Sequence, residues 1–390
     1  MTPLAAYDAF LTDRAARMRL RQLRPTAPGA PGRIRVGGRE LLNFASNDYL
    51  GLSRHPLLVE RARAWAAEYG TGSAASRLIC GDLELFGRVE SRLAAGKKVE
   101  AALIFNTGFQ ANGAILGALL DRGVLGGEPR VYADRLNHAS LHGGIQAAGA
   151  RQIRYRHNDL NHLADLLHRD RYAPGARFIV SESVFSMDGD QVDAVALAAL
   201  AREHDAFLYL DEAHATGVLG ENGFGLAQNG LADLAMGTFS KALGGFGAYA
   251  ACGRRLREYL INRCAGLIYS TALPPAVLGA MDAALELLPS LEETRRALLT
   301  GAEALRRALR DSGLETGNST TPIIPVMVGE DGAALAISRR LEEEGVWIPA
   351  VRPPAVPEGT ARLRLSLTAH HGPAEREAAL RALLRAMAGA

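Results

Sequence analysis

Residues 206–214 read AFLYLDEAH in one-letter code, an apolar run that ends abruptly in charged and polar side chains. Similar short apolar runs recur along the chain, separated by longer stretches in which apolar residues return at every third or fourth position. Alternation of short strands with helices is typical of βαβ units around a largely parallel sheet. The sequence therefore predicts a doubly wound α/β core.

Seven segments share the pattern of residues 206–214 and are predicted as strands of this core. They are residues 101–105, 130–133, 152–155, 177–181, 206–211, 234–238 and 247–252. Helical spacing of apolar residues predicts helices between them, for example at 108–120, 139–148, 160–169 and 195–204. The expected fold class is α/β, with a mostly parallel sheet in a large α/β/α domain.

The two ends of the chain differ in texture from this core. An arginine-rich helical stretch and a Gly- and Pro-rich segment come first, and we expect residues 1–45 to form an N-terminal arm. Past the core lie a long Leu/Ala/Arg helix, an apolar run at 323–328, another helix near 333–344 and a Pro-rich stretch at 351–357. We therefore predict a large domain over 46–288 and a smaller α+β domain over 289–390.

The composition of the 390 residues excludes several classes of protein. Lys and Arg number 44 against 42 Asp and Glu, and 48% of residues are apolar, so the chain can bury a large core and gives no overall field for nucleic acid or an anionic membrane. Three widely spaced cysteines argue against a disulfide framework. Neither a secretory signal nor an apolar stretch of about 18 residues is found, so we expect a cytoplasmic protein without a membrane or nucleic-acid partner.

Lysine is rare in this chain. Only Lys97, Lys98 and Lys241 stand among the 44 basic residues. An amine can lose its proton near neutral pH and act as a nucleophile, whereas a guanidinium group cannot. We expect Lys97 and Lys98 at the surface, because they follow Ala-Ala-Gly at an apparent helix end, where cations are favoured. Lys241 lies among glycines after a predicted strand and is the candidate nucleophile.

Polar residues cluster after the predicted strands, where open α/β sheets bind their ligands. These clusters are residues 106–109, 134–138, 181–190, 211–214 and 238–241. Gly108 starts a predicted helix, so backbone N–H groups there can approach a phosphate. A lysine for a Schiff base, an aspartate for a pyridine nitrogen and two histidines complete the set that pyridoxal 5′-phosphate requires. The sequence therefore predicts this cofactor.

Two other interpretations of the same residues are weaker. His138 and His142 have the i, i+4 spacing of metal ligands, but no third ligand is placed beside them by the sequence. Residues 211–214 also spell the DEAH box of a helicase ATPase, which needs a phosphate loop ending in Gly-Lys-Ser/Thr. The only Gly-Lys pair, Gly96-Lys97, lacks both the spacing and the hydroxyl. We therefore predict no metal.

Six motifs, in order along the chain, resemble those of the α-oxoamine synthases, a family of fold-type I pyridoxal-phosphate enzymes. They are residues 47–52, 134–140, 184–190, 211–217, 238–244 and 269–275. The resemblance implies an acyltransferase that condenses an amino acid with an acyl thioester and releases CO2. It implies L-alanine and a pimeloyl thioester as substrates, with glycine and acetyl-CoA as the alternative, and a homodimer with shared active sites.

The resemblance also implies roles around the cofactor. Lys241 would bind it covalently and then remove the Cα proton, Asp211 would pair with the pyridine nitrogen, His214 with the phenolic oxygen, and His138 would stack on the ring. The phosphate ligands would be Gly108, Phe109, Thr238 and Ser240, with Thr271 from a second subunit. Ser186 and Glu182 would line the cofactor and substrate cleft, with Glu182 on the substrate side. An aminotransferase or desulfurase of the same fold would use the same lysine and aspartate, but an aminotransferase would release no CO2. A non-catalytic scaffold would have lost them.

Substrate contacts implied by the resemblance fall near the two ends of the chain. Arg364 would hold the amino-acid carboxylate, with Arg352 close by. Arg21 corresponds to a position that contacts the acyl substrate, and Asn47 to one near the amino acid. Ala355 stands where relatives usually carry a threonine that touches substrate, and Phe86 replaces a common histidine, so the acyl-chain contacts depart from the family pattern.

Overall fold

The computed structural model describes residues 2–388, which divide into two compact units. Unit 1 combines the stretch that ends at Asn47, the short segment Met187–Asp190 and the chain from Ala297 onward. Unit 2 consists of Asp48–Ser186 and Gln191–Arg296. Within residues 2–388, no helix combines the length and apolar character needed to cross a membrane.

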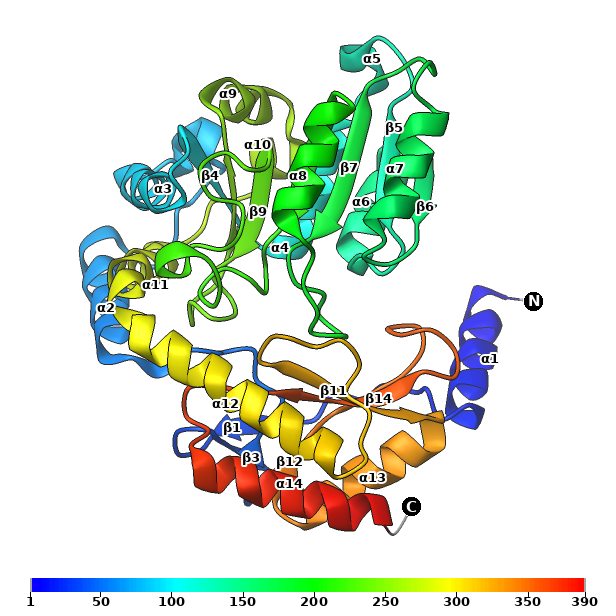
Figure 1. The fold of residues 1–390 in the computed structure, drawn as a ribbon. Helices are drawn as coiled ribbons and strands as arrows, with labels where there is room; N and C mark the ends of the chain where they lie inside the picture. The colour runs from blue at the N-terminus through cyan, green and yellow to red at the C-terminus, as the bar shows by residue number, and fades with distance from the viewer. Residues whose placement is uncertain (1, 389–390) are drawn as a thin grey trace. The chain divides into compact units, whose positions relative to one another are not determined.

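Unit 2 is built on a seven-stranded sheet with the order β4-β10-β9-β8-β7-β5-β6 (Figure 1). Its strands are β4 (Ala101–Phe105), β5 (Arg130–Asp134), β6 (Gln152–Tyr155), β7 (Arg177–Glu182), β8 (Ala206–Asp211), β9 (Leu234–Thr238) and β10 (Ala248–Cys252). Strand β10 runs antiparallel to both of its neighbours, β4 and β9, and the pairs among β9, β8, β7, β5 and β6 are parallel. The predicted α/β class with a mostly parallel sheet is confirmed.

Strands β4, β10 and β9, at one side of the sheet, are mostly apolar runs because both faces of the sheet are covered. Every residue of β4, β9 and β10 is buried. Helices α4 (Gly108–Leu119) and α6 (Ala139–Ala147) contribute Ile115 and Leu141 to a core that also contains Val180 of β7 and Met236 of β9. Helix α8 (Ala194–Glu203) lies in front of the sheet in Figure 1 and buries Leu197.

Further helices complete unit 2. They are α2 (Pro56–Tyr69), α3 (Glu84–Lys97), α5 (Arg122–Leu125), α7 (Leu160–Arg169), α9 (Arg254–Arg263), α10 (Ala265–Ile268) and α11 (Pro275–Leu287). Helix α7 shows why such stretches fold as helices, because Leu163, Leu166 and Leu167 are buried on one face, its N-cap Asp159 accepts from His162 N–H, and His168 and Arg169 end it.

Unit 1 holds two small sheets and three helices of the C-terminal part, together with the first helix of the chain. One sheet has the order β1-β2-β3-β12 and the other β11-β14-β13. The strands are β1 (Thr26–Pro28), β2 (Arg33–Val36), β3 (Arg39–Asn43), β11 (Ile323–Gly329), β12 (Val346–Trp347), β13 (Ala350–Val351) and β14 (Ala361–Ser366). The helices are α1 (Pro3–Ala16), α12 (Glu292–Asp311), which crosses the boundary at Arg296, α13 (Asp331–Glu343) and α14 (Pro373–Ala388).

Candidate active site

A cavity of about 280 Å³ lies in unit 2 at the carboxyl ends of strands β7, β8 and β9. Nine residues that the sequence analysis assigned to the site line it: Gly108, Phe109, His138, Glu182, Asp211, His214, Thr238, Ser240 and Lys241. Five further lining residues had no assigned role: Thr107, Asn112, Ser140, Ala213 and Met236. The strand ends therefore bring together groups from five separate stretches of the chain.

Lys241 is placed by the turn that follows β9, and its partner comes from the end of β8. The Lys241 Nζ lies 2.9 Å from Nε2 of His214. The other ring nitrogen, Nδ1, lies 2.7 Å from the hydroxyl of Tyr49, which is buried. With an ammonium group at Lys241 donating to Nε2, Nδ1 carries the ring proton and donates it to Tyr49. Tyr49 thereby orients the imidazole beside the lysine.

Asp211 and His138 are joined by two side chains that the sequence analysis did not assign. Asn112 Nδ2 donates to Asp211 Oδ2 at 2.8 Å and to Ser140 Oγ at 2.9 Å. Ser140 Oγ lies 2.7 Å from His138 Nδ1, and Asn112 Oδ1 accepts from the Tyr209 hydroxyl at 2.7 Å. This chain of hydrogen bonds fixes the direction in which the Asp211 carboxylate and the His138 ring face the cavity.

Burial sets the electrostatics of these groups. It raises the pKa of Asp211, against the attraction of Lys241 and the hydrogen bond from Asn112. Burial, reinforced by the charge of Asp211, also raises the pKa of Glu182 well above its usual value. Burial lowers the pKa of His138, which favours a neutral ring. Two buried carboxylates therefore face a cavity in which an additional cation would be stabilised.

Other residues that line the cavity are suited to a phosphate. Helix α4 begins there at Gly108, and Thr107 caps it by accepting from Gln110 N–H at 3.1 Å. The first N–H groups of a helix have no partner within the helix and carry its positive dipole end. The hydroxyls of Thr238 and Ser240, which also line the cavity, lie 2.7 Å apart. The donors, the lysine and the aspartate thus fit pyridoxal phosphate.

Two residues assigned to the cofactor do not line the cavity. Ser186 is partly buried, and Thr271 is exposed. The Thr271 backbone bridges to Ser76, and its carbonyl accepts from Asn106 Nδ2 at 2.9 Å. An exposed position is compatible with the predicted contribution of Thr271 to the site of a second subunit, which stays a prediction.

Apart from Glu182 on β7, which lines the cavity of unit 2, the residues assigned to the substrates lie in unit 1. Arg364 on β14 is buried and donates from both terminal nitrogens to Asn47 Oδ1, at 3.2 Å each. A second cavity, of about 230 Å³, is lined by Arg21, Arg352 and Ala355 together with Arg19. Unit 1 therefore gathers the assigned residues into an Asn47–Arg364 pair and an arginine-lined cavity.

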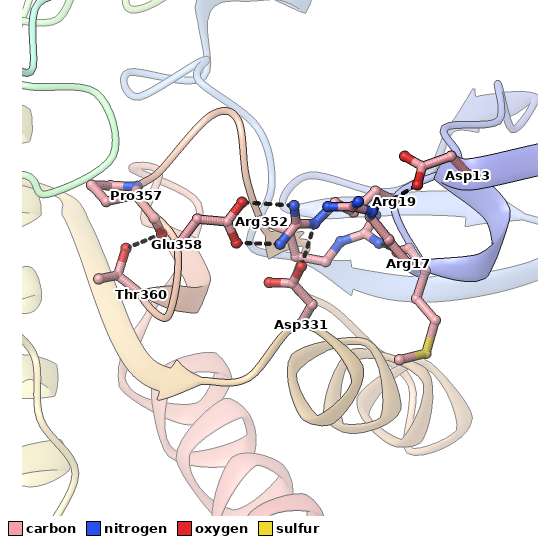
Figure 2. Close-up of polar contacts among 9 residues, drawn as sticks. Asp13, Arg17, Arg19, Asp331, Arg352, Pro357, Glu358 and Thr360 are labelled. Atoms are coloured by element: carbon pink, nitrogen blue, oxygen red, sulfur yellow. Dashed lines mark hydrogen bonds and ion pairs between the residues drawn. The ribbon is translucent and has the colours of Figure 1, made fainter. Parts of the chain in front are cut away.

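Acidic partners hold one arginine of this cavity. Arg19 donates to Asp331 Oδ2 at 2.6 Å and to Glu358 Oε1 at 2.8 Å (Figure 2). Arg352 donates to the carbonyl of Met18. Burial lowers the pKa of Arg352, and the charges of Arg21 and Arg19 lower it further, against the attraction of Asp331. An anion placed in the cavity would relieve this repulsion.

The expectation that Lys97 lies at the surface is wrong. Its side chain is 0% exposed and forms an ion pair with Glu212, whereas Lys98, the next residue, is exposed and pairs with Glu221 Oε2 at 2.7 Å. The last turn of α3 is covered by the loop near Phe224, because Gly96 has no side chain to keep that ring away. The local sequence resembles a solvated helix end, and only the packing shows otherwise.

The sequence held signals for two of the missed residues. Asn112 stands four residues after Gly108 on α4, so it lies one turn further along the same face of the helix. Ser140 follows His138 by two residues at the start of α6, and its backbone N–H lies 3.3 Å from His138 Nδ1. Helical spacing from a known site residue would have found Asn112.

Known proteins share this chain's sequence over almost its whole length. The model of the class I and II aminotransferases matches residues 39–383. The chain belongs to this aminotransferase family. A protein of Magnetococcus marinus is 61% identical over 371 residues, which cover 95% of this chain and 94% of that protein. The 8-amino-7-oxononanoate synthase of Gluconacetobacter diazotrophicus is 52% identical over 368 residues, covering 94% and 92%.

Solved structures of aminotransferase-family enzymes place the chain more narrowly. The serine palmitoyltransferase of Sphingomonas wittichii has 27% identity and a TM-score of 0.92, covering 100% of this chain and 99% of that one. The 8-amino-7-oxononanoate synthase of Francisella tularensis has 27% identity and a TM-score of 0.76, covering 88% and 97%. Both are α-oxoamine synthases. Another serine palmitoyltransferase structure that is similar to this chain contains pyridoxal phosphate as an internal aldimine. The predicted family, the enzymatic class and the pyridoxal-phosphate cofactor are confirmed.

Proposed function

We propose that this enzyme condenses L-alanine with a pimeloyl thioester, carried by coenzyme A or by a carrier protein, in biotin biosynthesis. The products are 8-amino-7-oxononanoate, CO2 and the free thiol. One observation carries the proposal: the complete lysine, aspartate and histidine set lines one cavity in a chain that is 52% identical to a named 8-amino-7-oxononanoate synthase. Glycine C-acetyltransferase activity, which needs the same set, is the alternative outcome of the assay below.

The residues of the cavity divide the work of the reaction. Pyridoxal phosphate, when bound, supplies the electron sink that stabilises a carbanion at the Cα atom of the amino acid. Asp211 keeps the pyridine nitrogen protonated, because a buried carboxylate stabilises a cation placed against it. The first turn of α4, Thr238 and Ser240 bind the phosphate, and His138 packs on the ring as a neutral imidazole.

Lys241 is the base that removes the Cα proton, and it needs a neutral amine to do so. His214 Nε2, at 2.9 Å, can accept a hydrogen bond from that amine. The hydroxyl of Tyr49 holds the imidazole through Nδ1, so the lysine keeps one direction while its charge changes. His214 therefore orients the base as well as facing the phenolic oxygen.

The arginines of unit 1 recognise the two carboxylates of the substrates. Arg364 presents a planar fork that matches the amino-acid carboxylate, and Asn47 aligns it. Arg21 and Arg352 bind the far carboxylate of the pimeloyl chain, since their cavity is electropositive and would be stabilised by an anion. Ala355, which lacks the usual hydroxyl, leaves the recognition to these arginines.

The test is thiol release by the purified enzyme loaded with pyridoxal phosphate, measured with each amino acid and thioester pair. L-alanine with pimeloyl-CoA should release thiol and one CO2 per thiol. Thiol released only from glycine and acetyl-CoA would assign the alternative activity. Transfer of an amino group to a 2-oxo acid without CO2 would make the chain an aminotransferase and contradict the proposal.

Arg21→Met should lower kcat/KM for pimeloyl-CoA by about 30-fold, because a hydrogen bond to a charged group contributes about 1.5–3 kcal/mol. The value for heptanoyl-CoA, which lacks the far carboxylate, should change little. Steady-state kinetics with both thioesters checks this, with exposed Arg33→Met as the matched control. Equal losses for the two thioesters would contradict the carboxylate contact.

We propose that the enzyme is a homodimer. Leu78, Ile79 and Tyr269 expose 52%, 79% and 84% of their surface in unit 2. Their segments lie together, since the residue before Arg77, Ser76, bridges to Thr271. Exposed apolar side chains gathered on one surface mark a protein interface. Sedimentation of the enzyme at twice its 41.5 kDa chain mass is the expected result, and a monomer at micromolar concentration would contradict it.

A further inference from the structure

Behind the cavity lies an ion pair that is shut off from solvent. Lys97, the last residue of α3, and Glu212, the first residue after β8, are both 0% exposed and in contact through Nζ and Oε2. Burial opposes the charge of Lys97, but the attraction of Glu212 and Tyr249 outweighs it and raises the pKa of Lys97. The contact with Glu212 therefore favours the ammonium form of Lys97.

The second oxygen of Glu212 is held by three other donors. Oε1 accepts from the Ser183 hydroxyl at 3.1 Å and from the backbone N–H groups of Leu226 and Ala227, the latter at 2.8 Å. The Lys97 Nζ also lies 5.2 Å from the ring centroid of Tyr249. Each group of the pair is thus enclosed by partners from several elements, and neither can turn toward water.

The pair is built into the turn that carries the cofactor residues. The Glu212 carbonyl accepts from the N–H groups of Ala215 and Thr216 at 3.0 and 2.9 Å. Its own N–H donates to the Met236 carbonyl on β9 at 2.6 Å. These bonds fix the turn that runs from Asp211 to His214. The position of Glu212 therefore influences the positions of Asp211 and His214.

Charge gives the pair a second effect on the cavity. Glu182, Asp211 and Glu212 are three buried carboxylates in adjoining strand ends, and burial already raises the pKa of Asp211. If Lys97 were removed, the uncompensated Glu212 carboxylate would raise the pKa of Asp211 further. A nearby negative charge makes it harder for Asp211 to lose its proton in a poorly solvated site. Asp211 carrying a proton of its own could not hold a protonated pyridine nitrogen.

The packing explains why this cation is a lysine in a chain that otherwise uses arginine. A Cβ on Gly96 would lie 2.2 Å from the Phe224 ring, and one on Gly225 would lie 2.5 Å from a Glu212 carboxylate oxygen. The backbone next to Lys97 therefore packs closely on Phe224, and the backbone at Gly225 packs closely on Glu212, the partner of the ammonium group. A planar guanidinium group is larger than an ammonium group and would not fit without moving these neighbours.

We propose that Lys97 is a positioning residue for cofactor binding: by neutralising Glu212 it holds the Asp211–His214 turn and leaves Asp211 as the anion that faces the pyridine nitrogen. The proposal depends on pyridoxal phosphate and on no particular substrate. Its failure would leave the proposed condensation untouched, and a wrong substrate assignment would leave the role of Lys97 standing.

Four proteins test the proposal: the wild type, Lys97→Met, the double variant Lys97→Met/Glu212→Gln, and Lys98→Met as the matched control on the neighbouring exposed lysine. For each, we would measure the Kd of pyridoxal phosphate for the cofactor-free protein. The pH midpoint of the bound cofactor's visible absorption band is the second readout. The thermal midpoint of the cofactor-free protein reports loss of folding separately.

Lys97→Met should weaken cofactor binding at least tenfold and move the absorption midpoint upward by about one pH unit, because an uncompensated buried carboxylate stabilises the protonated form of the bound cofactor. The double variant should return both values to within about threefold and about 0.3 pH unit of the wild type, because replacing both charges of a buried pair is tolerated where removing one is not. Lys98→Met should change neither.

Two results would overturn the proposal. One is a Lys97→Met protein that binds the cofactor and titrates like the wild type. The other is a double variant that fails to regain binding and midpoint, which would make the amine a packing element only. If Lys97→Met does not fold, a double variant that folds and binds supports charge compensation, and one that does neither overturns it.

Discussion

Lys241→Ala should lower turnover of L-alanine with pimeloyl-CoA by at least about 10³-fold, the upper part of the range for losing a positioned base and nucleophile. The methyl group can neither bind the cofactor covalently nor take the Cα proton. His214, whose Nε2 faces Lys241, is held at Nδ1 by Tyr49 and does not replace the amine. Thiol release under saturating substrates measures the loss.

Two variants separate loss of the amine from loss of charge or folding. Lys241→Arg keeps the positive charge but cannot lose its proton near neutral pH, so it should be as inactive as the alanine variant. Lys98→Ala, at an exposed position, should retain full activity. Turnover within tenfold of the wild type in Lys241→Ala would show that another group performs the proton transfer.

Asp211→Asn is expected to lower kcat by about 10²-fold while the cofactor still binds, because an ion pair with a carboxylate typically shifts a partner's pKa by about 1–3 units. An amide of the same shape keeps the contact with Asn112. It carries no negative charge, so it does not stabilise the protonated form of the pyridine nitrogen. The exchange of the alanine Cα proton with D2O, followed by NMR, measures this step without the acyl substrate.

The control for Asp211→Asn is Asp165→Asn, an exposed carboxylate on α7. It should exchange the Cα proton at the wild-type rate. Exchange at that rate in Asp211→Asn as well would mean that the carboxylate only packs against the ring, and the division of roles proposed here would be wrong.

The strands of the unit 2 sheet could be predicted closely because the burial of each strand is visible in its own short stretch of sequence. Strands such as β4 and β9 are buried along their whole length, so they appear in the sequence as unbroken apolar runs between turns. Because ligands bind beyond the ends of such strands, the sequence also indicates that Asp211, His214 and Lys241 share one cavity. The predicted and observed strands differ only in their limits; for example, the strand predicted at 130–133 is Arg130–Asp134 in the structure.

The parts that escaped prediction depend on contacts between distant segments. From the sequence, Lys97 was expected at the end of a solvated helix. The Phe224 ring that packs against Gly96 is far away in the sequence, so no local pattern indicates this contact. The N-terminal stretch contains strands that the sequence did not predict, and β3 pairs in parallel with β12, with Leu42 opposite Val346. No periodicity within either segment encodes that partnership.

The pairing between β3 and β12 also affects the order in which the two units can fold while the chain is being synthesised. Ribosomes release the N-terminus first, and domains generally fold as units while the chain grows. Unit 2 has all its residues once Arg296 has emerged, whereas β3 must wait for a strand more than 300 positions later. Nascent chains of increasing length should therefore become resistant to protease within residues 48–296 before the earlier-made N-terminal stretch does.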